Sequence, residues 1–285
     1  MKKYKFGVLG LGKMGSSILN GIINSKIFNI EDVLLFDVND QIISMYSMKG
    51  FKFTKSESEL IENVEMLLIS IKPQMFKIFN DINLKLEDNQ LIIISVVAGK
   101  TIFDLEQIFG KQNYIRVMPN TPALINAGAT AIARKDVPDE IFEVVKKIFL
   151  SVGVVEEITE DKMNEIIPVN GSMPAFLYYF METYIDDAVS KGIDYDVATK
   201  LCAEAIIGSA KMVLESGKPI SELIKDVCSP GGATLAGLKV FDDCDFKKII
   251  IDSNEACINR AYELSKLKWG VLWDMNYFVF YQMSN

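Results

Sequence analysis

A glycine-rich turn near the start of the chain has the residue types and spacing of a dinucleotide-binding site. The apolar run at residues 6–9 is typical of a buried strand, and Gly10-Leu11-Gly12-Lys13-Met14-Gly15 follows it directly. One glycine makes the tight turn, one lets the backbone approach a pyrophosphate, and the third lets the next helix pack close to the strand. The amino end of that helix then faces the anion. We therefore predict that residues 10–15 bind a dinucleotide.

A carboxylate follows at the place where such sites contact the adenosine ribose. The next apolar run, residues 33–36, ends in Asp37, about 20 residues after the last glycine of the turn. An ordinary strand-to-helix turn is the alternative, because GxGxxG alone is a weak signal. Val38, Asn39 and Asp40 come next, without an arginine to hold a 2′-phosphate. A carboxylate repels that phosphate, so we predict NADH in preference to NADPH.

Three further loops follow apolar runs and are expected at the same edge of a parallel sheet. Their small residues and prolines let the backbone lie flat against a nicotinamide ring, although the same residue types are common in turns. Ligands in such folds bind beyond the carboxyl ends of the strands. The cofactor-binding residues predicted in these loops are Ile71, Lys72, Pro73, Ala98, Gly99, Asn120, Thr121 and Pro122.

Two glycine-containing turns in the second half of the chain each precede a predicted helix. They read Asn170-Gly171-Ser172-Met173-Pro174 and Ser229-Pro230-Gly231-Gly232-Ala233-Thr234. Both would present backbone N–H groups at a helix start, which is a natural site for a carboxylate. Thr234 adds a hydroxyl group there. Two capped turns without a ligand are the alternative.

The composition excludes several classes of function. The chain has 285 residues, a formal net charge of −8 and no histidine. The charge argues against nucleic acid or an anionic membrane as the main partner. Without histidine there is no Ser-His-Asp or Cys-His site and no imidazole proton donor beside a nicotinamide. Four cysteines without CxxC spacing indicate free thiols in a reducing cytosol and argue against a metal site. Early glycines interrupt any signal peptide, so we expect a cytoplasmic protein without a membrane segment.

The periodicity of the chain changes at about residue 158. Before it, apolar runs alternate with amphipathic segments, which predicts βαβ units and a parallel sheet. The predicted strands are 5–9, 33–36, 66–71, 91–95, 114–118, 129–133 and 152–156. The predicted helices between them are 14–25, 41–48, 57–62, 102–109 and 138–150.

The remainder of the chain has helical spacing only. One helix is predicted from Val197 to Gly217 with Asp194 as its N-cap, another begins at an N-cap Ser221, and a third runs from Phe246 to Leu267. The stretch 173–181 is apolar on all sides, which indicates burial between subunits. The predicted fold class is α/β, with a Rossmann-type, doubly wound, mainly parallel sheet at residues 1–158. An all-helical substrate-binding and dimerisation domain follows at 159–285.

The motifs together resemble pyrroline-5-carboxylate reductase, in order and over nearly the whole chain. The resemblance rests on the glycine turn with Met14, on Lys72-Pro73 and Val97-Ala98-Gly99, and on two more specific motifs: Arg116-Val117-Met118-Pro119-Asn120-Thr121-Pro122 and Ser229 to Thr234. It implies a reductase that transfers hydride from NAD(P)H to the cyclic imine 1-pyrroline-5-carboxylate, the final step of proline synthesis. It also implies a helical domain that dimerises through interlocking helices, and a homo-oligomer.

The resemblance also implies roles for individual residues. The substrate carboxylate would bind backbone N–H groups of the two turns, at Gly171, Ser172, Met173, Pro174, Gly232, Ala233 and Thr234. The Thr234 hydroxyl would contact the ring nitrogen, Glu160 would favour the cationic iminium, and Lys72 would complete the catalytic set. An imine carbon is already electrophilic, which suits a chain without histidine.

Several residues depart from the family pattern. The family turn usually reads Ser-Gly-Ser-Gly-Pro-Ala, and this chain has Asn170 for the first serine and Met173 for the second glycine. Asp226, assigned to the cofactor side, stands where a neutral amide is common. Glu57 adds a second acid near the adenosine.

These departures leave other readings open. They allow a regulatory protein that binds a dinucleotide without catalysis, or a reductase of a related cyclic imine. A β-hydroxyacid dehydrogenase is disfavoured because the helix after Pro174 has no lysine before Lys191.

Overall fold

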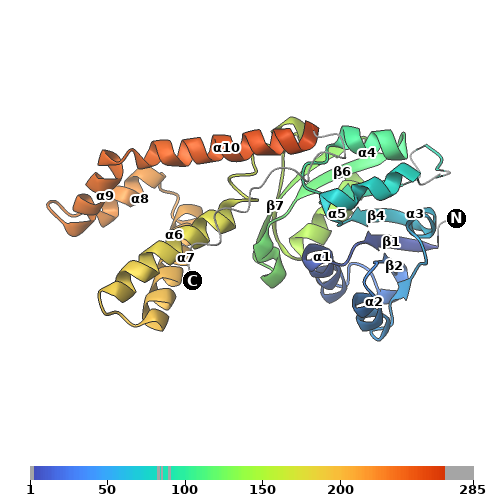
Figure 1. Cartoon of the computed structure of the whole chain (residues 1–285), viewed down its shortest axis with the longest axis horizontal. Helices are drawn as coiled ribbons and strands as arrows, with labels where there is room; N and C mark the ends of the chain where they lie inside the picture. The colour runs from blue at the N-terminus through green and yellow to red at the C-terminus, as the bar shows by residue number, and fades with distance from the viewer. Residues whose placement is uncertain (1–2, 82–83, 85, 89–90, 267–285) are drawn as a thin grey trace. The chain divides into compact units, whose positions relative to one another are not determined.

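The apolar runs of the first half form one eight-stranded sheet in the computed structural model, which describes residues 3–81, 84, 86–88 and 91–266 (Figure 1). The strands, in the order β3-β2-β1-β4-β5-β6-β7-β8 across the sheet, are Lys52–Phe53, Val33–Phe36, Tyr4–Leu9, Val64–Ile69, Ile92–Ser95, Asn113–Met118, Gly128–Lys135 and Gly153–Glu157. All neighbouring pairs are parallel except β6 and β7. The predicted α/β class with a mainly parallel, Rossmann-type sheet is confirmed.

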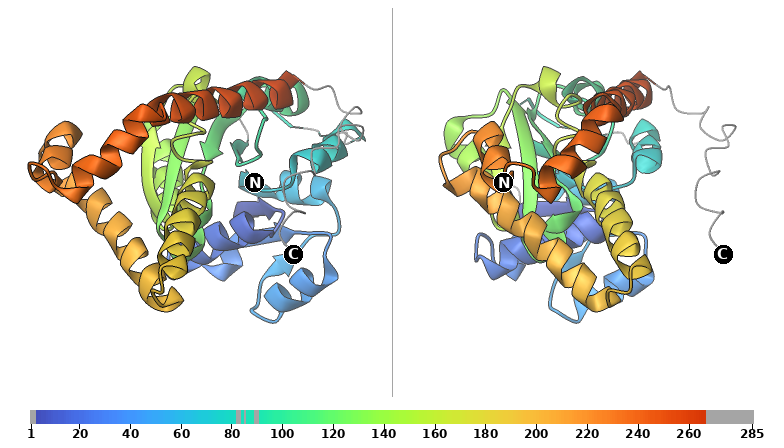
Figure 2. Two further views of the ribbon diagram at one scale, coloured as in Figure 1. Left: turned by 60° about the vertical axis from the view of Figure 1, so that its left-hand side comes forward. Right: turned by 90° about the vertical axis from the view of Figure 1, so that its left-hand side faces the viewer.

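Helices cover both faces of this sheet (Figure 2). On one face, α1 (Lys13–Asn24), α2 (Asp40–Ser47) and α5 (Asp139–Leu150) pack on inward-facing strand residues such as Phe6, Val8 and Leu35. On the other face lie α3 (Glu57–Asn63), α4 (Ile102–Phe109) and the 3-10 segment η2 (Pro73–Asp81). The strands are buried on both sides, which explains their nearly continuous apolar sequences.

The second half of the chain is helical, as predicted. It contains α6 (Met173–Ser190), α7 (Tyr195–Glu215), α8 (Ile220–Val227), α9 (Ala233–Asp243) and α10 (Phe246–Lys266). Asp194 caps α7, because its side chain accepts from the backbone N–H groups of Asp196 and Val197. Leu267, the predicted end of the last helix, lies outside the described residues.

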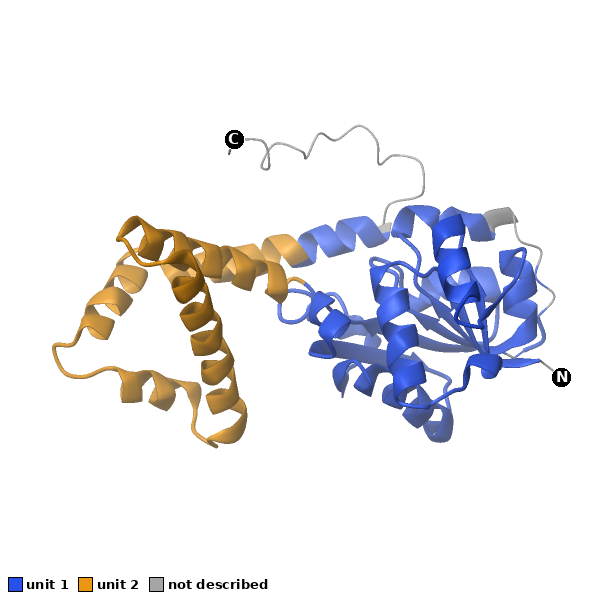
Figure 3. Ribbon diagram, turned by 90° about the horizontal axis from the view of Figure 1, so that it is seen from below, with its two compact units in different colours: residues 1–171, 258–285 blue, residues 172–257 orange. Residues whose placement is uncertain are grey.

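The chain divides into two compact units, Met1–Gly171 with Ile258–Asn285, and Ser172–Cys257 (Figure 3). The sequence pattern places the change after residue 158, where the last strand ends. The compact unit continues to Gly171 because residues beyond β8 still pack on the sheet. Met163, for example, is fully buried against Ala131 and Ala133 of β7.

Some details differ from the sequence predictions. Residues 160–171 form turns and the short 3-10 helix η4 (Glu160–Lys162), although the sequence after residue 158 has helical spacing only. Ser221 is not a cap, since α8 begins one residue earlier, after Pro219. Several short elements, β3 and η2 among them, are not predicted by the sequence. The two-residue strand β3 is too short to leave a periodic pattern, and η2 follows a proline that suggested only a loop.

The apolar stretch at the start of α6 is largely exposed within the single chain. Tyr178 is 60% exposed and Tyr179 75%, and Leu201 on α7 is 65% exposed. Aromatic surface of this kind on two successive helices is typical of a protein–protein contact. Within the described residues, no helix has both the length and the apolar composition needed to cross a membrane.

Candidate functional site

The glycine turn has no space for side chains at two of its three glycines. Gly10 has φ +91°, and a Cβ there would lie 2.6 Å from the carbonyl oxygen of Ser70. A Cβ on Gly15, in the first turn of α1, would lie 2.2 Å from the Gly10 carbonyl oxygen. Gly12 differs, because no atom lies within 4 Å of the position of its Cβ. The first and third glycines thus serve packing, and the second leaves open space at the amino end of α1, as a pyrophosphate requires.

Asp37 is held by the backbone on both of its carboxylate oxygens. Oδ2 accepts from the N–H of Leu11 at 2.6 Å, and Oδ1 accepts from the N–H of Asn39 at 2.8 Å. These bonds join the end of β2 to the glycine turn at the end of β1. The carboxylate is therefore oriented in advance, and each oxygen keeps a lone pair with which to accept from a ribose hydroxyl.

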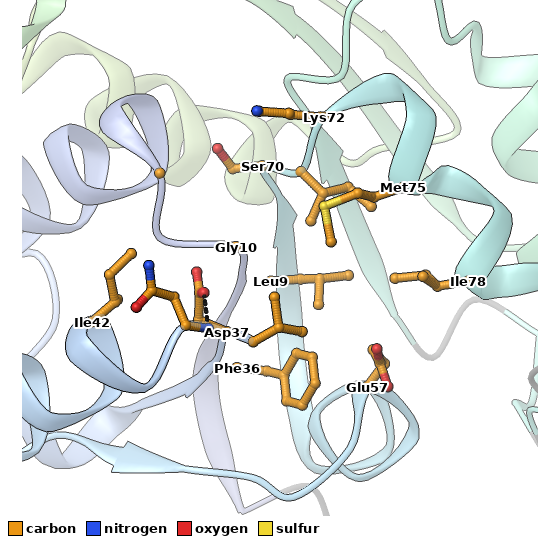
Figure 4. A pocket seen from close by; sticks show the side chains of 14 residues that line it. Leu9, Gly10, Phe36, Asp37, Ile42, Glu57, Ser70, Lys72, Met75 and Ile78 are labelled. Atoms are coloured by element: carbon orange, nitrogen blue, oxygen red, sulfur yellow. Dashed lines mark hydrogen bonds between the residues drawn. The ribbon is translucent and has the colours of Figure 1, made fainter. Parts of the chain in front are cut away.

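A pocket of about 330 Å³ opens beside this turn (Figure 4). Asp37 and Glu57 lie on either side of Phe36, with Ile42 at one side of the pocket and Met75 and Ile78 at the other. Its wall is completed by Leu9, Gly10, Gly12, Val38, Asn39, Ser70, Ile71 and Lys72. The structure thus brings together five residues predicted for the cofactor: Gly10, Gly12, Asp37, Ile71 and Lys72. The lining holds two acids against one lysine, so the pocket has a negative balance.

Pro73, Ala98 and Gly99 lie at the same sheet edge, just after strands that run parallel to β1. Pro73 begins η2, and Ala98 and Gly99 form an exposed turn after β5 in which Gly99 has φ +72°. These three residues are not among those that line the pocket. Lys13 and Met14 begin α1, and the Leu11 side chain is buried in the core beneath it.

The loop after β6 is tied to the glycine-turn helix and to the substrate turn. Thr121 and Pro122 begin the 3-10 helix η3 (Thr121–Ile125), and the hydroxyl group of Ser17 on α1 donates to the Ala123 carbonyl oxygen at 2.7 Å. Asn120 is buried, and both ends of its amide bond to the protein's own backbone. The Asn120 side chain therefore fixes the backbone next to Thr121 and Pro122.

Glu160 lies in a polar network around the buried Arg116, with its own side chain 32% exposed. Its Oε1 accepts from Nη1 of Arg116 at 3.1 Å and from the N–H of Ile102, at the start of α4, at 3.0 Å. Arg116 is only 4% exposed, and its Nη2 donates to Oδ1 of Asn164 at 3.1 Å. Oε2 of Glu160 is buried without a hydrogen-bond partner. The carboxylate thus joins β6, the start of α4 and η4, which the sequence did not reveal because these residues are far apart along the chain.

The two predicted substrate turns begin helices of the second half, as expected. Gly171 ends the first compact unit, Ser172 precedes α6 with its Oγ 3.0 Å from Sγ of Cys257, and Met173 and Pro174 form the first turn of α6. Met173 has helical backbone and is 36% exposed.

Gly232 is the N-cap of α9, and Ala233 and Thr234 are its first residues. Thr234 and Asp226 line a mostly apolar hollow of about 390 Å³. The carboxylate of Asp226 is ion-paired with Lys218 at 2.7 Å. Asp226 and Thr234 therefore lie together in the second compact unit.

The residues that the sequence did not assign to a site include some that shape the pocket of the first unit. Ser70, Met75 and Ile78 line the pocket, and Arg116 anchors the network beneath the loops. Ser70 could have been found, since it follows β4 directly, but it was counted as part of the strand. Met75 and Ile78 are visible only once η2 is known to be helical.

A doubly wound sheet, a glycine turn and a fixed carboxylate at the end of β2 define a protein of the dinucleotide-binding oxidoreductase class, here with a helical second part. Comparisons with known proteins narrow this class. Residues 160–264 match the model of pyrroline-5-carboxylate reductase dimerisation, and residues 5–99 match the model described as NADP oxidoreductase coenzyme F420-dependent.

Several similar proteins are pyrroline-5-carboxylate reductases. The pyrroline-5-carboxylate reductase of Escherichia coli is 33% identical over 267 residues, which cover 92% of this chain and 98% of that protein. The crystal structure of Plasmodium falciparum pyrroline carboxylate reductase with NADP bound has a TM-score of 0.81 at 29% identity, covering 93% of this chain and 99% of that one. The reductase from Coxiella burnetii has a TM-score of 0.82 at 26% identity, covering 93% and 100%. The chain belongs to the pyrroline-5-carboxylate reductase family, as its motifs suggested.

Alanine at Gly12 and at Gly15 should have opposite effects. Gly15→Ala places a methyl group against the Gly10 carbonyl and should lower the free energy of unfolding by about 1–3 kcal/mol. Gly12→Ala has free space and a negative φ, so the melting temperature should stay unchanged while NADH affinity falls at least about tenfold, or about 1.4 kcal/mol. Thermal unfolding and fluorescence titration with NADH measure the two effects. Equal losses of stability in both variants would contradict this division of roles.

Removal of the Glu160 carboxylate should destabilise the fold. Glu160→Ala leaves Arg116 buried with Asn164 as its remaining side-chain partner and deprives Ile102 of its acceptor, so urea unfolding should show a loss of about 2–3 kcal/mol. Glu157→Ala is the matched control, because its partner Arg134 is more exposed; it should cost at most about 1 kcal/mol. A loss no larger than that of the control would show that the network contributes little.

Proposed function

We propose that the chain reduces 1-pyrroline-5-carboxylate to L-proline with NAD(P)H as hydride donor, the final step of proline biosynthesis. The observation that carries the proposal is the family relationship over 92% of the chain, together with a glycine-turn pocket whose geometry suits a dinucleotide. The bound dinucleotide would supply the hydride. The residues of the chain would bind, orient and shield the imine.

This reaction requires little acid–base catalysis by the protein. The imine carbon is electrophilic before binding, so rate depends on orientation and on charge at the ring nitrogen. We assign the substrate carboxylate to the N–H groups of the turns around Gly171–Pro174 and Gly232–Thr234. The Thr234 hydroxyl would contact the ring nitrogen, and Glu160 would favour the iminium. Lys72, exposed at the edge of the pocket, would be the nearby cation.

The division of labour follows the sequence pattern. We assign dinucleotide binding to residues 1–158, and substrate binding and dimerisation to 159–285. The exposed apolar residues of α6 and α7 support a homodimer or higher homo-oligomer. The acidic net charge supports a protein without nucleic-acid or membrane partners, acting in the cytoplasm.

Turnover with the imine is the direct test. Purified protein should oxidise NADH, followed at 340 nm, only when 1-pyrroline-5-carboxylate is present. Thr234→Ala should lower kcat by about 10²-fold, the usual size of a lost proton-transfer or positioning contact. Thr183→Ala, which removes an exposed hydroxyl on α6 that bonds only its own helix, should leave kcat unchanged.

Two results would overturn the proposal. Absence of turnover despite measurable NADH binding would indicate a regulatory protein without catalysis. Turnover with a six-membered cyclic imino acid and not with 1-pyrroline-5-carboxylate would assign a different ring size.

We further propose that NADH is preferred to NADPH. Asp37 and Glu57 both line the pocket, and a 2′-phosphate close to them would be repelled by about 1–4 kcal/mol per charge pair at 4 Å. The kcat/KM for NADH should therefore exceed that for NADPH at least tenfold. Glu57→Gln should raise kcat/KM for NADPH several-fold and leave that for NADH unchanged.

Glu62→Gln is the matched control for this substitution, since Glu62 lies on the same helix but does not line the pocket. A wild-type preference for NADPH would contradict the prediction outright.

A further inference from the structure

Two asparagine side chains join the loop after β6 to the turn before α6. Nδ2 of Asn120 donates to the main-chain carbonyl of Asn170 at 3.1 Å, and Oδ1 of Asn120 accepts from the N–H of Ala129 at 2.9 Å. In return, Nδ2 of Asn170 donates to the carbonyl of Met118 at 2.8 Å and lies 3.5 Å from that of Ala129. We call this arrangement of Asn120 and Asn170 the amide interlock. All of its members lie in the first compact unit.

The interlock provides hydrogen bonds where the main-chain pairing of β6 with β7 ends. The pairing of β6 with β7 ends at Met118 and Ala131, because β6 is followed by Pro119 and turns away. Beyond that pair, the side-chain amides of Asn120 and Asn170 form the hydrogen bonds to the main-chain groups of Met118 and Ala129. The loop that carries Thr121 and Pro122 is therefore held at its base by hydrogen bonds to the backbone of other segments.

Each amide can adopt only one orientation. Asn120 faces an N–H at one end and a carbonyl at the other, and Nδ2 of Asn170 faces two carbonyls, so reversing either amide would place like groups against each other. Both residues are at least nine-tenths buried. The hydrogen bonds of the interlock are therefore compatible with one orientation of each amide.

The interlock is retained despite an energetic cost. Oδ1 of Asn170 is buried without a hydrogen-bond partner, and an unsatisfied buried acceptor costs about 1–3 kcal/mol. The family turn usually has serine at this place, with a side chain too short to span both carbonyls as the amide does. A buried polar feature with an energetic cost calls for a function, and its position indicates one.

We propose that Asn120 and Asn170 are positioning residues for the reductase reaction, an inference that rests on the proposed function. Asn120 directly precedes the predicted nicotinamide loop at Thr121 and Pro122, and Asn170 directly precedes the predicted substrate turn at 171–174. The interlock holds the first residues of these two segments at a fixed separation. Hydride transfer needs reacting atoms about 3–3.5 Å apart, and an error of about 1 Å costs about 10²-fold in rate.

Asn170→Ala tests the role against a matched buried amide. Gln112 is 2% exposed, accepts from the N–H of Leu91 and donates to the carbonyl of Glu87, at the opposite edge of the sheet. Gln112→Ala and Asn170→Ala should both lower the melting temperature. Only Asn170→Ala should lower kcat/KM for the imine, by about 10–100-fold per folded molecule, while NADH affinity stays within about threefold.

Asn170→Asp adds a pH signature that loss of stability alone would not produce. A carboxyl group facing two carbonyls can restore the bond to Met118 only when it is protonated, so its pKa should be raised. The ratio of mutant to wild-type kcat should therefore be highest at acid pH and fall as pH rises through that pKa. A ratio independent of pH would count against the interlock.

Hydrogen exchange provides a readout that does not depend on imine turnover. NADH binding should slow amide exchange in residues 171–175 of the wild-type protein, and Asn170→Ala should abolish this coupling while NADH still binds. Equal kinetic effects of Asn170→Ala and Gln112→Ala, or coupling that persists in Asn170→Ala, would overturn the proposal. If the wild-type protein does not turn over the imine at all, the proposed function fails, and the exchange experiment still decides whether the interlock couples the two segments.

Discussion

The contact between the first turn of α1 and the end of β1 is the constraint on which the site depends. A Cβ on Gly15 would lie 2.2 Å from the Gly10 carbonyl oxygen, and one on Gly10 would lie 2.6 Å from that of Ser70. Glycine has no side chain, so at these two places the backbone of α1 can approach the sheet closely. The amino end of α1 is then left open beside Gly12. The bond from Leu11 to Asp37 then ties this turn to the next strand. One close approach of backbone segments thus determines the pocket. It also determines the positions of Asp37 and of the amino end of α1 within the pocket.

The parallel sheet extends this local geometry to the remaining loops. Since β1, β2, β4, β5 and β6 run in the same direction, the segments that follow them emerge at one edge. Antiparallel β7 departs from this pattern, and its pairing with β6 ends early. The amide interlock and the ion pair of Arg116 with Glu160 lie where regular strand pairing no longer determines the backbone, so polar side chains determine it there.

Local sequence patterns predicted most of the fold and part of the site. The runs 33–36 and 102–109 match a strand and a helix to the residue, because an apolar run between turn signals and a Thr101 cap leave little freedom. Topology alone predicts that Gly10, Asp37 and Lys72 lie close together at one edge of the sheet.

Contacts between distant residues could not be predicted in this way. Arg116 and Glu160 carry no pattern that links them, and η2 begins at a proline that suggested only a loop. The apolar start of α6 predicts burial between subunits, and its exposure within one chain becomes visible only in three dimensions.

The two departures in the substrate turn have different physical meanings. Met173 stands where the family has glycine, yet its backbone is helical, and no left-handed conformation requires glycine at this position. The substitution therefore leaves the path of the chain unchanged and acts only through the volume and apolar surface of its side chain. Asn170 acts in the opposite way: it is buried and determines where the turn begins through bonds to Met118 and Ala129. A turn anchored by an amide at its first residue needs less from the residues that follow, so the anchoring role of Asn170 is a physical reason why a bulky residue at 173 is compatible with an ordered helix start.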